Sequence, residues 1–144
     1  MKDLYSGLAA DFGVETVVVT ADANGASIDM QGYNSLMVIG AIGASGDTLS
    51  GSVYIELELE ESDDDSTFTD VADADLQNSV TGTNTGTFAV INDPAEDSQV
   101  YKTGYKGTKR YVRPVVNVTG THTNGTPIAL LMVRGNAESG PVNL

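Results

Sequence analysis

The sequence has no cysteine and no tryptophan, and it has only one histidine and seven basic residues in 144. Without cysteine there can be neither disulfides nor thiolate zinc sites, so packing and backbone pairing must hold the fold together. The single histidine, His122, lies among Thr and Gly with no serine elbow or thiol nearby. We therefore expect a solvated loop side chain there, no catalytic residues, no cofactor and no enzymatic activity.

Long apolar runs are missing too. The longest, residues 36–44, is broken by Gly40 and Gly43 and is far too short to span a bilayer. Residues 1–13 lack the apolar stretch of a signal peptide. We therefore expect a protein that is made in the cytoplasm and has no membrane partner.

Charge is divided unevenly along the chain, and its formal net value is −13. Ten of the twenty acids lie in residues 56–75, whereas five of the seven bases lie in residues 102–113. The acidic excess argues against a nucleic-acid partner, although tyrosines alternate with the bases. We expect Lys109, Arg110 and Arg113 to pair with acids across a subunit boundary. Pairing within the chain, between neighbouring strands, is the alternative.

Period-two alternation marks the clearest strands. In residues 52–60, apolar side chains alternate with Tyr54, Glu56, Glu58 and Glu60, which predicts one inward face and one outward acidic face. Residues 109–119 alternate as well, and Pro114 indicates an edge position or a bulge. Asn-, Asp- and Gly-rich turns separate seven or eight such runs. The sequence predicts an all-β, two-sheet β-sandwich, jelly-roll or immunoglobulin-like, with these core residues: Val53, Ile55, Leu57, Leu59, Val116, Val118, Leu130 and Met132.

The two ends lack strand periodicity. We expect an N-terminal arm over residues 1–13, one sandwich domain over residues 14–135 and a C-terminal tail over residues 136–144. The arm is unusually apolar for a free end. We expect it to bind a partner through Leu4, Tyr5, Leu8 and Phe12.

The acidic segment invites two chemical interpretations. Paired carboxylates serve glycosidases, but Glu56, Glu58 and Glu60 are expected on an open strand face, where a solvated strip is the simpler interpretation. Asp63, Asp64 and Asp65 lack EF-hand spacing and suit an Asp-rich turn. We expect no metal site, and whether Asp63–Asp65 binds calcium stays open.

Two stretches resemble a group of small virion proteins encoded among the head genes of tailed bacteriophages and prophages. The first is residues 59–71, which end in Thr67-Phe68-Thr69-Asp70-Val71. The second is residues 100–121, within which Gly104 to Arg113 (GYKGTKRYVR) is the more specific part. Residues 31–36 fit the same pattern.

This resemblance implies a structural protein on the virion, most simply a decoration or cement protein that stabilises the outer surface of a bacteriophage head. It implies the major capsid protein and further copies of this chain as partners, with a trimer as the expected oligomer, and synthesis in the bacterial host. The alternatives are a head–tail connector or tail component, and a carbohydrate-binding module, which the missing tryptophan disfavours.

Overall fold

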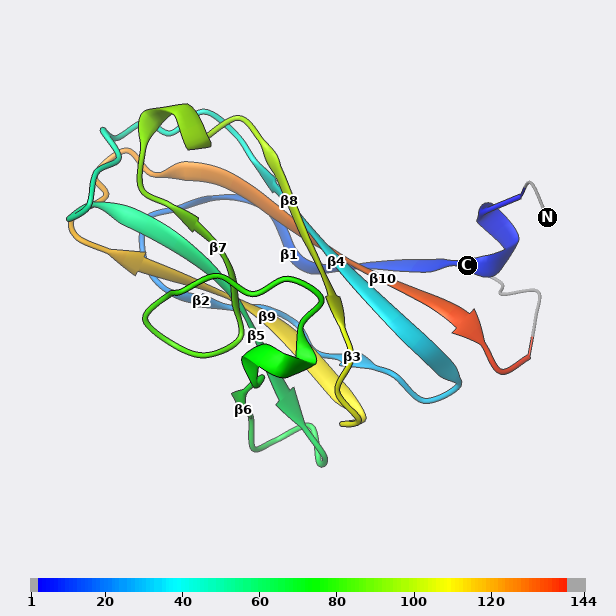
Figure 1. Ribbon diagram of the computed structural model, residues 1–144. Coiled ribbons are helices and arrows are strands. Elements are labelled where there is room, and N and C mark those ends of the chain that lie inside the picture. Colours follow the sequence, from blue (N-terminus) through cyan, green and yellow to red (C-terminus); the bar gives the residue numbers. More distant parts are fainter. Residues whose placement is uncertain (1–2, 140–144) are drawn as a thin grey trace.

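The structure is a computed structural model that describes residues 3–139 (Figure 1). Its ten strands are separated by turns and three short 3-10 helices, η1 (Tyr5–Gly7), η2 (Asp73–Asp75) and η3 (Pro94–Glu96). The strands are β1 (Ala9–Val19), β2 (Ala23–Asn24), β3 (Ile28–Asp29), β4 (Tyr33–Ile42), β5 (Tyr54–Ser62), β6 (Thr69–Asp70), β7 (Thr87–Ile91), β8 (Val100–Tyr105), β9 (Tyr111–Thr119) and β10 (Thr126–Ala137). Within the described residues, no helix has the length and apolar character needed to cross a membrane.

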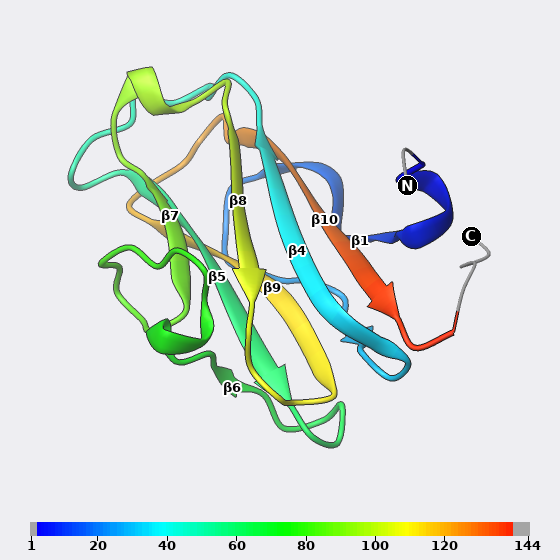
Figure 2. The ribbon, with the colours of Figure 1, turned by 45° about the vertical axis from the view of Figure 1, so that its right-hand side comes forward.

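The strands form two antiparallel sheets that pack face to face, which confirms the predicted β-sandwich. Sheet A has four strands in the order β1-β10-β4-β8, side by side in Figure 2. Sheet B has six, in the order β2-β9-β5-β6, with β3 also on β9 and β7 also on β5. Because β2 and β3 pair with the same strand, as do β6 and β7, each pair acts as one interrupted strand. The resulting order is that of a jelly roll rather than an immunoglobulin domain.

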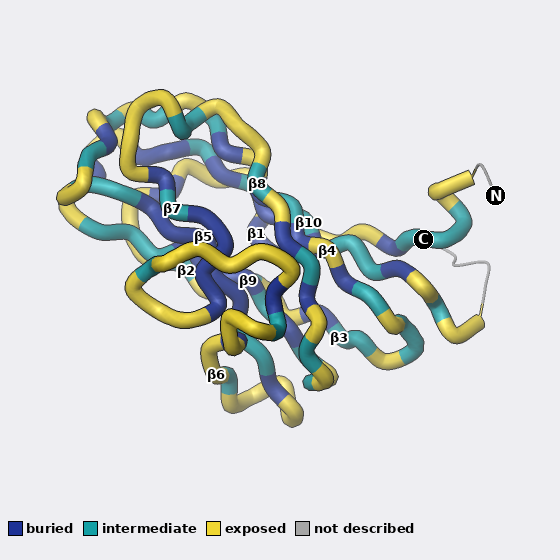
Figure 3. The backbone as a smooth tube through the Cα atoms, viewed as in Figure 1, coloured by how far each residue is buried: buried dark blue, intermediate teal, exposed yellow. Residues whose placement is uncertain are grey.

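The core lies between the two sheets, and Figure 3 shows the buried stretches of their strands in dark blue. Leu57 on β5 and Leu130 on β10 are fully buried, as are most of the predicted core residues. Val53 and Val118 are only partly buried, since both lie near strand ends. Leu36, Val38 and Ile42 add the β4 contribution. The alternation of β5 thus predicted its inward face correctly.

Pro114 lies in neither an edge strand nor a bulge. Strand β9 pairs with β5 along its whole length without a register shift. On its other side, β2 pairs with Val115 and Val116, and β3 pairs with Tyr111 and Val112. Pro114 therefore faces the gap between β2 and β3, where its missing N–H breaks no ladder bond on that side. Gly25 donates its N–H to the Pro114 carbonyl across this gap at 2.8 Å.

Both terminal boundaries differ from the predicted ones. Strand β1 begins at Ala9, inside the predicted arm, and pairs with β10 from Ala9↔Arg134 onward. The segment before it contains η1 and reaches Leu8. At the other end, β10 continues to Ala137, beyond the predicted boundary at residue 135. Residues 1–2 of the predicted arm and 140–144 of the predicted tail lie outside the described residues.

Truncating Leu57 tests the inner face of β5. Leu57→Ala removes a fully buried side chain between the sheets, so we expect the free energy of unfolding to fall by about 2–5 kcal/mol. Urea denaturation measures this change. The control is Val100→Ala on β8, whose side chain is 67% exposed and should matter little. Equal midpoints for both variants would show that the face is wrongly assigned.

Candidate functional site

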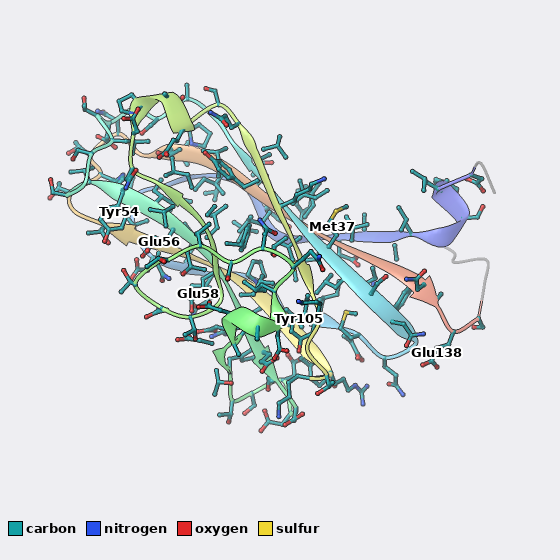
Figure 4. All side chains as sticks on the ribbon, viewed as in Figure 1. Met37, Tyr54, Glu56, Glu58, Tyr105 and Glu138 are labelled. Atoms are coloured by element: carbon teal, nitrogen blue, oxygen red, sulfur yellow. The ribbon has the colours of Figure 1, made fainter. Side chains whose placement is uncertain are left out.

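The acidic face of β5 is buried, which contradicts the expected solvated strip. Glu56 is 2% exposed and Glu58 is 1% exposed. Their side chains do point away from the core, as the alternation predicted. The segment between β6 and β7 covers these two side chains from outside. Figure 4 shows this segment beside the labelled Glu56 and Glu58. The outer face of sheet B is thus partly closed by the chain itself.

Three N–H donors, one from the backbone and two from side chains, donate hydrogen bonds to these carboxylates from distant segments of the chain. The Thr83 N–H donates to Glu56 Oε1 at 2.8 Å. Asn84 Nδ2 donates to Glu58 Oε2 at 3.1 Å, and Asn117 Nδ2 on β9 donates to the same oxygen. Gly86 allows the covering segment to return, because at φ 80° it approaches the Leu59 and Val71 carbonyls where a Cβ would clash. Each amide therefore offsets part of the cost of burying a carboxylate.

Glu58 belongs to a compact group of three acids. One carboxylate oxygen each from Glu58, Glu60 and Asp70 lies within 4.8 Å of the other two. Within residues 3–139, no other set of three or more acids, histidines or cysteines brings its possible ligand atoms together in this way. Burial, with the nearby Asp70 carboxyl, raises the pKa of Glu58 to about 7, although Asn84 and Asn117 oppose the shift. The group therefore holds a carboxyl that takes up or loses its proton near neutral pH.

The Asp63–Asp65 turn uses its carboxylates differently. Asp63 pairs with Lys109, and Asp65 accepts a hydrogen bond from Ser27. Asp64 accepts the N–H groups of Ser66 and Thr67 at 2.9 and 2.8 Å, which holds its pKa below the ordinary value. Each of the three carboxylates thus has partners of its own, and together they close a hairpin, as an Asp-rich turn should.

The three basic residues predicted to pair across a subunit boundary already have acidic partners within the chain. Besides the Lys109–Asp63 pair, Arg110 binds Asp29 through two bonds of 3.0 and 2.9 Å. Arg113 lies 2.6 Å from Glu60 and stacks over Phe68. These pairs favour the intramolecular alternative that the sequence left open. Pairing across a subunit boundary stays a prediction.

The predicted arm residues do not form one site. Leu4, just before η1, and Tyr5, its first residue, are 77% and 74% exposed. Leu8 is half-buried, and its side chain lies beside Gly135 of β10. Phe12 is 51% exposed but belongs to β1, so it lies on sheet A rather than on a free arm. Binding of a partner by these residues is still a prediction.

The outer face of sheet A is a surface that the sequence interpretation missed. In register, Ala10, Val133 and Met37 form one cross-strand row, and Phe12, Leu131 and Ile39 form the next. We call this surface the outer face of sheet A. The strand register assigns to it the following residues: Ala10, Phe12, Met37, Ile39, Ala41, Val100, Lys102, Ala129, Leu131 and Val133. Lys102 is its only charged member. The continuous apolar run of β4, which lacks polar alternation, was the available signal.

His122 is buried rather than solvated, which corrects the expectation for this loop. It is 5% exposed, and its Nε2 lies 3.0 Å from the Thr119 carbonyl. Its Nδ1 faces Asp47 at 3.9 Å. Asp47 also accepts the N–H groups of Asn124 and Gly125, which lowers its pKa. This arrangement gives His122 a role in anchoring the β9–β10 loop.

Comparison with known proteins identifies no family. No family model matches the chain, and no curated protein matches it. Among solved structures, the chain is similar to the prophage-derived protein YomS of SPBc2, at 13% identity and a TM-score of 0.47 over 88% of this chain and 91% of YomS. It is also similar to a chain from a study of Bacillus endospore appendages, described as disulfide-linked pili, at 11% identity and 0.45 over 92% and 90%. Similarity this weak transfers no function.

The raised pKa of Glu58 predicts a pH-dependent stability. The folded protein keeps this proton to about pH 7, whereas an unfolded glutamate loses it near pH 4.3. The contribution of Glu58 to the free energy of unfolding is therefore full below about pH 4.3 and is lost as the pH rises to about 7. In buffer without divalent cations, we expect wild-type urea midpoints to fall over this range relative to those of Glu58→Gln. Parallel pH profiles would contradict the shift.

Proposed function

We propose that this protein is a non-enzymatic structural component of a bacteriophage particle, and specifically a decoration or cement protein on the outer surface of the head. Its partners are the major capsid protein and further copies of the same chain. The motifs in residues 59–71 and 100–121 supply the link to phage head genes. The outer face of sheet A supplies the surface through which such a protein can attach.

That outer face is the observation that carries the proposal. The outer face of sheet B is partly covered by the segment between β6 and β7, so the chain buries that surface itself. On sheet A, by contrast, Phe12, Met37 and Val100 are 51%, 37% and 67% exposed. An apolar surface of several rows, rimmed by polar loops, is typical of a protein–protein interface. A structural subunit needs such a surface and needs no catalytic group.

The apolar residues, rather than the charges, should supply most of the affinity. The 3-10 helix η1 projects beyond the end of β1 and β10 (Figure 1), and the exposed side chains of Leu4 and Tyr5 offer further apolar area near that end of sheet A. Lys109 and Arg110 are already paired within the chain, and exposed ion pairs contribute only about 0–1 kcal/mol each. Attachment should therefore weaken only modestly as the salt concentration rises.

Rebinding to stripped particles tests the proposal. We expect Met37→Asp to abolish binding, because it places a charge in the middle of the apolar rows, and Leu4→Ser with Tyr5→Ser to weaken it. Substitution is preferable to deleting residues 1–12, which would remove part of β1. Bound copies are counted by sedimentation and a stain-quantified gel.

Thr85→Asp is the matched control, because it adds the same charge to an exposed residue in the part of the β6–β7 segment that lies over sheet B, between Asn84 and Gly86. It should rebind like the wild type, and all variants should show the wild-type circular dichroism spectrum. Full rebinding of Met37→Asp would contradict attachment through this face. A copy number of a few per particle would instead indicate a connector or tail component.

A further inference from the structure

Three carboxylates meet on the outer face of sheet B, and the strand register explains why. Asp70 on β6 lies directly opposite Glu60 on β5. Glu58 lies two residues before Glu60, so its side chain leaves the same face of β5. One oxygen from each residue lies within 4.8 Å of the other two. The strand register thus brings the three carboxylates to one place on the outer face of sheet B.

The charges of this group are only partly balanced by the surrounding residues. Like charges directly opposite each other in a strand pair are destabilising, as Asp70 and Glu60 are here. Arg113, opposite Glu60 on β9, offsets one negative charge through its 2.6 Å contact with Glu60 Oε2. Two of the three negative charges remain when all the carboxylates are ionised.

One buried oxygen of Glu58 lacks a hydrogen-bond donor in residues 3–139, which is independent of the number of acids nearby. Glu58 is 1% exposed, and its Oε1 has no hydrogen-bond partner within the described residues. Its other oxygen, Oε2, accepts from both Asn84 and Asn117. A buried carboxylate oxygen without a donor is costly, and native structures rarely leave one without a ligand, water or proton. Either a proton, shared with the nearby Asp70 carboxyl, or a cation must therefore satisfy Glu58 Oε1.

We propose that Glu58, Glu60 and Asp70 bind a calcium ion. All the available ligands are carboxylate oxygens, which suit a hard cation. Asp70 is exposed and Glu60 is half-buried, so water can complete an irregular coordination shell. Calcium tolerates such a shell, whereas magnesium requires a near-octahedral one. The ion would fasten β6, which is only two residues long, to β5 and so order the acidic hairpin between them.

Calcium titration of the isolated protein tests this proposal independently of particle attachment. After EDTA treatment and dialysis, isothermal titration calorimetry with CaCl₂ should show one site, and the melting temperature should rise with calcium concentration. Glu58→Gln and Asp70→Asn should each weaken binding by about tenfold or more. Asp70 is exposed, so Asp70→Asn should fold even if Glu58→Gln does not.

Glu56→Gln is the matched control, because it is the same substitution on the same buried face but outside the group of three acids. It should bind calcium like the wild type. The proposal is overturned if the wild type shows neither heat nor a melting shift up to millimolar calcium, the result expected if a shared proton occupies the site. It is also overturned if Asp70→Asn binds as tightly as the wild type, or if magnesium binds more tightly than calcium.

Discussion

The alternation of side chains along β5 constrains the rest of this structure. Packing Ile55, Leu57 and Leu59 into the core forces the intervening glutamates onto the opposite face. Because the chain covers part of that face, the glutamates buried there need hydrogen-bonding or charged partners. The chain supplies them with Asn117, Arg113 and the covering segment that carries Asn84. One strand thereby sets both the core and the polar layer outside sheet B.

The two outer faces of the jelly roll consequently have opposite characters. The face of sheet B is acidic and is largely satisfied within the chain by amides and by Arg113. The face of sheet A is apolar and is left open, with Phe12 and Met37 among its exposed residues. Since one face is acidic and partly covered by the chain and the other is apolar and open, a partner that needs apolar contact has one clear place to bind. This division underlies the proposed structural role.

Local patterns in the sequence predicted local features well. The alternation in residues 52–60 predicted the inward residues, and the turn-rich composition predicted a two-sheet sandwich. The burial of Glu58 was not predictable in this way, because its cover comes from Asn84 and Asn117, distant in sequence, and no periodicity reports such contacts. For the same reason His122 was wrongly expected to be solvated, since Asp47 shapes its loop from far along the chain. The start of β1 was missed because Ala9 and Ala10 carry no strand signal.

The most direct test of the account compares the accessibility of the two outer faces in the free and assembled protein. The chain has no cysteine, so single cysteines can be introduced and labelled without background. A thiol at Met37, on sheet A, should react in the isolated protein and be protected in the assembled particle. A thiol at Thr85, between Asn84 and Gly86 in the segment over sheet B, should react in both. Equal labelling of the Met37 thiol in both states would contradict the claim that sheet A is the attachment surface.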